Sequence, residues 1–175
     1  MATYSASLQA VHKPSAPGPY IVENIIDIAV ENAANAAALA ANDVLEIFTV
    51  PANTLILAAG IEQIVALVGE SNDTTWNLGL VGASTGGSAA DVDLFAAVWD
   101  GDAAVAGYYS TPVAANLPVV VAGSTTIDLE LQAAGTAPTA GSIRVWAVMM
   151  DIDGRGAPAT GARYDANEVD RDLLA

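Results

Sequence analysis

Few side chains in this 175-residue sequence have a type and spacing that could carry out chemistry. His12 is the single histidine and lies in a proline-rich segment, whereas a Ser–His–Asp arrangement needs its base fixed in a cleft. Cysteine is absent, which removes thiolate catalysis, thiolate metal sites and disulfides. The segment STGGS, residues 84–88, lacks the Gly-Lys-Ser/Thr that completes a phosphate-binding loop, and it indicates a turn. We therefore predict no catalytic residue, no cofactor and no enzymatic activity.

Acidic residues come in closely spaced pairs, at positions 91/93, 100/102, 128/130 and 151/153. A hard cation such as calcium needs several carboxylate and carbonyl oxygens gathered in one flexible loop. The segment DIDGRG, residues 151–156, looks like the opening of such a loop. It lacks the third acidic ligand and the later glutamate of an EF-hand, so we predict no complete metal site.

Carbohydrate chemistry is the other candidate. Two carboxylates at a suitable separation can hydrolyse a glycoside, but 20 acids in 175 residues will produce such a pair by chance. A sugar-binding platform would need exposed aromatic side chains. In strands these residues more often belong to a core or an interface, which is the interpretation we favour for the four candidates, Trp76, Trp99, Tyr108 and Tyr109.

The charge balance excludes two classes of partner. The formal net charge is −15, and the bases are Lys13, Arg144, Arg155, Arg163 and Arg171. Nucleic-acid binding relies on arrays of Lys and Arg, and an anionic membrane surface repels an acidic chain. No apolar run reaches the ~18 residues of a spanning helix, and the first 19 residues do not read as a signal peptide. We therefore expect no nucleic-acid or membrane partner, and synthesis in a host cytoplasm.

The elements that position these residues are mostly strands. Ile127, Leu129 and Leu131 alternate with Asp128 and Glu130, which predicts that the first three are buried and the two acids exposed. About ten such runs are separated by turn signals, a spacing typical of a sandwich or a closed barrel. The expected strands are 20–30, 43–51, 54–59, 61–68, 74–81, 92–100, 105–110, 117–122, 124–131 and 142–151. Residues 61–68 also permit a helix, and the alanine-rich residues 31–43 permit a short one.

Three zones organise the chain. Residues 1–19 are small, polar and rich in proline, which predicts an extended N-terminal arm. Residues 20–151 contain nearly all the apolar runs and form the predicted β-sandwich domain. Residues 152–175 turn polar again and form a predicted C-terminal arm. The two arms hold four of the five basic side chains.

The strand at 142–151 is apolar on both faces. Ile143, Val145, Ala147 and Met149 make one face; Trp146, Val148 and Met150 make the other. Such a strand is either central in its sheet or covered by a neighbouring subunit. We predict a homo-oligomer, a dimer first and a trimer second. The predicted interface residues are Trp146, Val148 and Met150, with Arg155, Arg163 and Arg171 binding an acidic neighbour.

Two stretches carry a resemblance to known proteins: LAANDVLEIFTVPANTLILAAGIEQI, residues 39–64, and TTIDLELQAAGTAPTAGSIRVWAVMMDIDG, residues 125–154. They resemble a group of small virion proteins of tailed phages. Asn53 stands where the group usually has glycine, and asparagine also suits a left-handed conformation.

The resemblance implies a head decoration (cement) protein without catalytic residues. It also implies a jelly-roll-like antiparallel β-sandwich on the outer surface of a capsid, in contact with the major capsid protein. The alternative is a carbohydrate-binding or adhesive module of a phage fibre or spike, because fold alone does not determine function.

Overall fold

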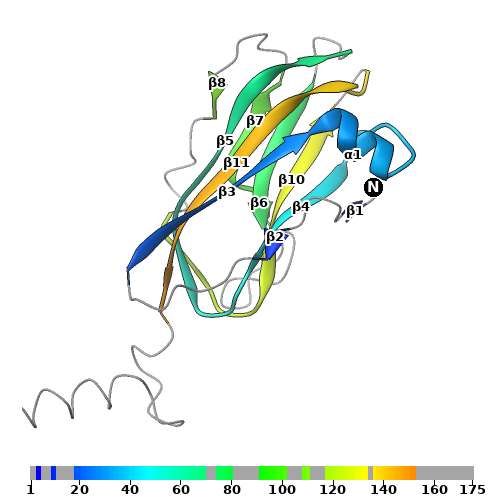
Figure 1. The fold of residues 1–175 in the computed structure, drawn as a ribbon. Coiled ribbons are helices and arrows are strands. Elements are labelled where there is room, and N and C mark those ends of the chain that lie inside the picture. The colour runs from blue at the N-terminus through cyan, green and yellow to red at the C-terminus, as the bar shows by residue number, and fades with distance from the viewer. Residues whose placement is uncertain are drawn as a thin grey trace, which may run out of the picture.

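Two β-sheets pack face to face, with one short helix beside them (Figure 1). The structure, a computed structural model, describes residues 3–4, 9–10, 18–69, 74–80, 91–101, 108–110, 117–133 and 136–152. The antiparallel β-sandwich predicted from the sequence is confirmed. The one helix among the described residues has seven residues, and none there is long and apolar enough to span a membrane.

Sheet A has the strand order β1-β4-β10-β6-β7, and β2 also pairs with β4. Its strands are β1 (Thr3–Tyr4), β2 (Gln9–Ala10), β4 (Asp43–Val50), β6 (Thr75–Leu80), β7 (Asp91–Asp100) and β10 (Thr125–Ala133). Sheet B has the order β3-β11-β5-β8, and β9 also pairs with β5. Its strands are β3 (Pro19–Asp27), β5 (Thr54–Val68), β8 (Tyr108–Tyr109), β9 (Val119–Val121) and β11 (Ala140–Asp151).

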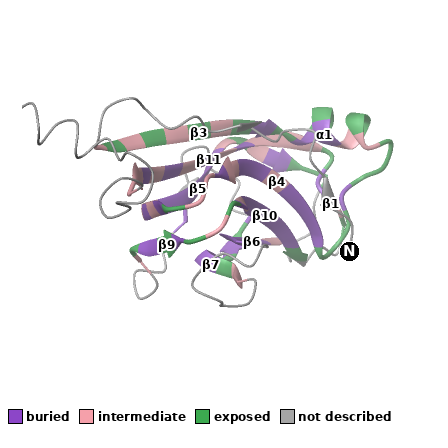
Figure 2. Cartoon of the chain, turned by 90° about the horizontal axis from the view of Figure 1, so that it is seen from below, coloured by how far each residue is buried: buried purple, intermediate pink, exposed green. Residues whose placement is uncertain are grey.

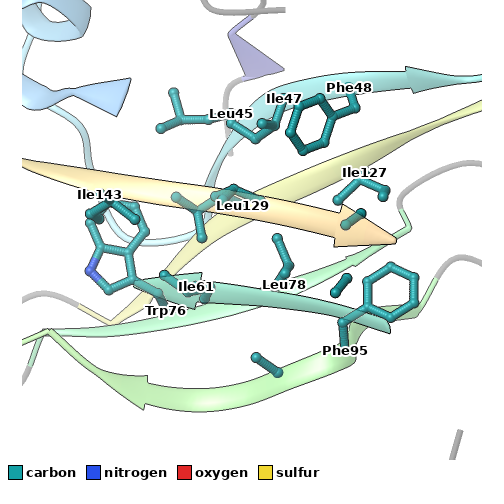
Figure 3. Close-up of a cluster of buried hydrophobic side chains, with 14 of the residues drawn as sticks. Leu45, Ile47, Phe48, Ile61, Trp76, Leu78, Phe95, Ile127, Leu129 and Ile143 are labelled. Carbon is teal, nitrogen blue, oxygen red and sulfur yellow. The ribbon is translucent and has the colours of Figure 1, made fainter. Parts of the chain in front are cut away.

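The core lies between the two sheets. Figure 3 shows Leu45, Phe48 and Leu129 of sheet A among the buried side chains, with Ile61 and Ile143 of sheet B in the same cluster. A β-bulge in β4 places both Ile47 and Phe48 in this core, because Ile127 pairs with Phe48 while Asp128 pairs with Glu46. The predicted burial is confirmed for Ile127, Leu129, Leu131, Val145 and Ala147, all 0% exposed.

The predicted exposure of Asp128 and Glu130 is wrong. Their side chains lie on the outer face of sheet A, yet Asp128 is 2% and Glu130 9% exposed. β10 is an interior strand, flanked by β4 and β6, so side chains of two neighbouring strands surround its outward residues. Hydrogen bonds compensate the burial: the Thr126 hydroxyl donates to Asp128 Oδ2 (2.9 Å), and Asn77 Nδ2 donates to Glu130 Oε2 (3.1 Å).

The predicted strand over residues 20–30 is too long. β3 ends at Asp27, and helix α1 (Ile28–Ala34) follows at once. The Asp27 carboxylate accepts from the backbone N–H groups of Ala29 (2.9 Å) and Val30 (3.3 Å), which caps the first turn of the helix. The helix expected within 31–43 therefore begins earlier, and Val30, which belongs to it, is 61% exposed.

β5 resolves the ambiguity at residues 61–68 in favour of a strand. It is one 15-residue strand that also contains the expected strand at 54–59. The turn before it, Pro51 to Asn53, places Asn53 at φ 57°, the left-handed conformation expected there. The Asn53 carbonyl accepts from the backbone N–H of Ile152 (3.0 Å), so this turn also fixes the end of β11.

Two dipeptides of the predicted N-terminal arm lie along the outer edge of β4. β1 pairs in parallel with Val44 and Leu45, and β2 pairs in parallel with Phe48 and Thr49. The other residues up to 17, which include His12 and Lys13, lie outside the described residues, as does the predicted C-terminal arm from residue 153 onward.

Candidate interaction surface

The exposed apolar surface of this protein is concentrated on sheet B. Seven large hydrophobic side chains are exposed among the described residues. Five of them belong to sheet B: Ile21, Ile25, Val65, Val68 and Val120. The other two, Val30 and Val98, lie on α1 and on β7. Isolated exposed hydrophobic residues are ordinary, but a group on one sheet marks a candidate binding surface.

The strand pairing places three of these residues, Ile21, Ile25 and Val120, on the outer face. Ile21 pairs with Val148, and Ile25 pairs with Arg144, on the side of β11 that faces away from the core. Leu55 pairs with both Met150 and Val120, which extends the same face across β5 to β9. We call this surface the open face; its apolar members are Ile21, Ile25, Leu55, Val120, Trp146, Val148 and Met150. Figure 2 shows β3 at the edge of the sandwich with exposed and intermediate residues alternating along it.

β11 lies at the centre of sheet B, between β3 and β5. Ile143, Val145, Ala147 and Met149 are fully buried in the core, as the sequence pattern requires. The predicted interface residues Trp146, Val148 and Met150 are half-buried on the open face. Their residual exposure leaves apolar surface in contact with solvent, so a central position in the sheet does not by itself cover this strand.

Trp146 is held in place by a glycine on the neighbouring strand. Gly60 lies directly opposite Trp146, and a Cβ atom at Gly60 would stand 2.8 Å from the indole Cζ2. Only a residue without a side chain leaves room for the ring to lie across β5. The indole therefore lies over the backbone of β5 on the open face.

Arg144 is the single Lys or Arg among the described residues, which contain twelve Asp and Glu. Its guanidinium binds the carboxylates of Glu62 and Glu23, the latter at 3.5 Å. The Glu62 side chain is 8% exposed and the Glu23 side chain 60%. The open face thus carries both signs of charge, whereas the other charged side chains of the described residues are all carboxylates.

The outer face of sheet A has a different character. Asn77 links two strands there, because its Nδ2 donates to Glu130 and its Oδ1 accepts from the backbone N–H of Val98 (2.8 Å). Val98 has a φ of 49°, at an irregularity in the pairing of β6 with β7. Sequence patterning missed this polar network; the asparagine at the outward position of an apolar strand was its one local signal.

The remaining candidate residues do not form a chemical site among the described residues. The pKa of Asp91 is raised above its ordinary value, first by a hydrogen bond with the Asp93 carboxyl and then by burial and the charge of Asp93. No three His, Cys, Asp or Glu side chains come together in the described parts of the chain. The second acid of the 100/102 pair and of the 151/153 pair, Asp102 and Asp153, lie outside those parts.

The aromatic candidates for a sugar platform divide into two groups. Trp76 and Trp99 form a cross-strand pair and are 0% and 4% exposed, which confirms their interpretation as core residues. Tyr108 and Tyr109 are described only through their backbone, which pairs with Gln63 and Glu62 of β5. Two of the four candidates therefore cannot contact a sugar.

Comparison with known proteins shows which solved structures have a similar fold. No family model and no curated protein matches the chain. Among solved structures, a chain in the "Capsid of Ralstonia phage GP4" superposes with a TM-score of 0.60 at 20% identity, over 86% of this chain and 98% of that one. A chain in the "Cyanophage Pam1 capsid asymmetric unit" gives a TM-score of 0.53 at 14% identity, over 83% of this chain and 94% of that one. This sandwich is similar to folds found in the capsids of two phages.

Proposed function

We propose that this protein is a structural component of a phage virion that decorates the outer surface of the head. It stabilises the capsid by binding the major capsid protein and further copies of itself. The observation that carries the proposal is the fold similarity to the two capsid chains, which extends over 98% and 94% of their lengths. These chains consist of little besides the shared fold, as expected for proteins that act by occupying a surface.

The described residues support a binding role. Sheet B, which bears the open face, carries most of the exposed large apolar side chains among the described residues. The only basic side chain among those residues, Arg144, lies on the same face. A surface of this kind suits association with another protein, in which apolar burial supplies most of the affinity.

Attachment to the head is assigned to the C-terminal arm. Residues 20–150 hold 14 acids and one base, whereas Arg155, Arg163 and Arg171 lie within the last 21 residues of the sequence. Arginine forms bidentate hydrogen bonds with carboxylates, so a segment with spaced arginines can bind across an acidic surface of the capsid protein. This part of the proposal rests on the sequence, because these arginines lie outside the described residues.

The test is a binding assay on heads that lack this protein. Purified chain is mixed with such heads, which are then sedimented, and bound chain is quantified at increasing salt. We expect saturable binding and heads that withstand more heating. The Arg155→Gln/Arg163→Gln/Arg171→Gln variant should bind most weakly, while the matched triple lysine variant, which keeps the charge but loses the bidentate hydrogen bonds, should bind with intermediate strength. Failure of the unmodified chain to bind heads, or its location on tails of intact virions, would overturn the proposal.

A further inference from the structure

The open face of sheet B requires a partner of its own, and we infer that this partner is a second copy of the chain. The two copies stack sheet B against sheet B around a twofold axis, so that each open face covers the other. This inference rests on the proposed function and deepens it, because it names the surface through which two copies of the chain bind each other. It rests on three properties of the face: its apolar character, its charges and its size.

The apolar character gives the driving force. Ile21 is 71%, Ile25 56% and Val120 46% exposed, and the half-buried Trp146, Val148 and Met150 lie between them. Removing apolar area from water gives about 25 cal/mol per Å². Within the sandwich, sheet A already covers the inner face of sheet B in this way, and flat sheets stack face to face about 10 Å apart. A second sheet B offers the same kind of surface on the outside.

The charges select a second copy over a basic partner. Outside the open face, the charged side chains of the described residues are all carboxylates. A partner with a basic surface would therefore be attracted to those other surfaces. The open face alone presents a guanidinium, that of Arg144, together with the 60% exposed carboxylate of Glu23. A face with both signs is self-complementary under a twofold rotation, because the arginine of one copy can approach the glutamate of the other.

The size of the face fits a dimer. Four strands at about 4.8 Å spacing give a width of about 19 Å, and the nine residues of β3 at about 3.4 Å give a length of about 30 Å. The product is about 570 Å² of flat surface on each copy, or about 1,100 Å² for the pair, before side-chain relief is counted. Specific interfaces bury a total of about 1,200 Å² or more. The flat projection of two open faces thus comes close to this lower limit, and the relief of the side chains brings the buried area to that of a small dimer interface.

The experiment uses the full chain and two matched glutamate substitutions. Val120 lies on the open face and is 46% exposed; Val30 lies on α1 and is 61% exposed. The molar mass in solution is measured by sedimentation equilibrium at micromolar concentration, with folding checked by circular dichroism. We expect a dimer for the unmodified chain and for Val30→Glu, and a monomer for Val120→Glu. Ile21→Glu is the second open-face variant; since Ile21 is 71% exposed, it should become monomeric without a loss of folding.

Several outcomes would overturn the inference. A monomeric unmodified chain would do so, as would a trimer, or dimers of both open-face variants. If the unmodified chain is monomeric and Val120→Glu no longer binds heads, the capsid protein covers the open face in place of a second copy.

The salt dependence separates this inference from the proposed function. Two copies with a net charge of −15 repel each other, so screening should strengthen the dimer as sodium chloride rises from about 0.05 M to about 1 M. Head attachment through arginines should weaken over the same range. A dimer that does not bind heads would contradict the proposed function alone, whereas a monomer that binds heads would contradict the dimer alone. A dimer that weakens with salt would contradict apolar stacking of the open faces.

Discussion

The indole of Trp146 lies across Gly60, its partner on the neighbouring strand, with the Cζ2 atom 2.8 Å from where a Cβ atom of residue 60 would stand. The two residues belong to β11 and β5, which form the centre of sheet B. A large ring and a missing side chain thus complement each other in shape, and this contact fixes where the indole lies on the open face.

Gly60→Ala is expected to destabilise the protein by about 1–3 kcal/mol, because the added methyl group collides with the indole and the buried strand cannot move away. The measurement is chemical denaturation at one fixed protein concentration. In a Trp146→Leu background the same substitution should cost clearly less, since the ring is gone. An equal cost in both backgrounds would show that the indole is not the obstacle.

Arg144→Met is expected to cost about 1–3 kcal/mol. The substitution leaves the Glu62 carboxylate, whose side chain is 8% exposed, without its guanidinium partner. Adding Glu62→Gln should restore part of the loss, because the uncharged amide is cheaper to bury. The control is Glu23→Gln, where the carboxylate is 60% exposed and the effect should stay below about 0.5 kcal/mol. If the Glu62→Gln addition brings no recovery, Arg144 acts through its packing alone.

Asn77→Leu is expected to cost about 2–3 kcal/mol, because it removes the hydrogen-bond partner of the buried Glu130 carboxylate and of the Val98 N–H. Thr75→Val is the comparison on the same strand, where the lost bond to the exposed Gln132 should cost under about 1 kcal/mol. Thermal denaturation of both variants gives the two values, and similar losses would contradict a special role for Asn77.

Glu31→Gln should change how stability depends on pH. Glu31 is 3% exposed, and burial raises the pKa of its carboxyl above the ordinary value of 4.5. The folded protein therefore holds this proton to a higher pH than the unfolded chain, and stability falls as the pH rises past 4.5 toward the folded pKa. The glutamine amide does not titrate and stays uncharged. The variant should therefore be the more stable protein at neutral pH and differ little from the unmodified protein in acid. Denaturation across the pH range tests this; a difference that does not vary with pH would refute it.

The alternation of apolar and polar residues correctly predicted which side of β10 faces the core. It could not predict that Asp128 and Glu130 are buried as well, because their exposure depends on β4 and β6, strands far away in the sequence that flank β10 in the sheet. Local patterns specify the face of a strand, whereas the position of that strand in a sheet is a long-range property.

The open face was predicted in part for a related reason. Trp146, Val148 and Met150 stand out because their strand is apolar on both sides. Ile21 and Ile25 were missed because Glu23 and Asp27 share their side of β3, and that side reads as a solvated surface. The end of β3 did carry a local signal: Asp27, an N-cap residue, precedes an alanine-containing segment, and α1 begins there inside the strand expected at 20–30.

The pairing of β3 with β11 has a consequence for how this chain is made. Tyr20 lies opposite Met149, so β3 leaves the ribosome long before β11, the strand that pairs with it. Until β11 emerges, both β3 and the long strand β5 present free edges to other nascent chains, and such edges are templates for aggregation. Folding dominated by distant pairings is also slow. We therefore expect this protein to fold after its synthesis and to depend on chaperones when it is made in large amounts.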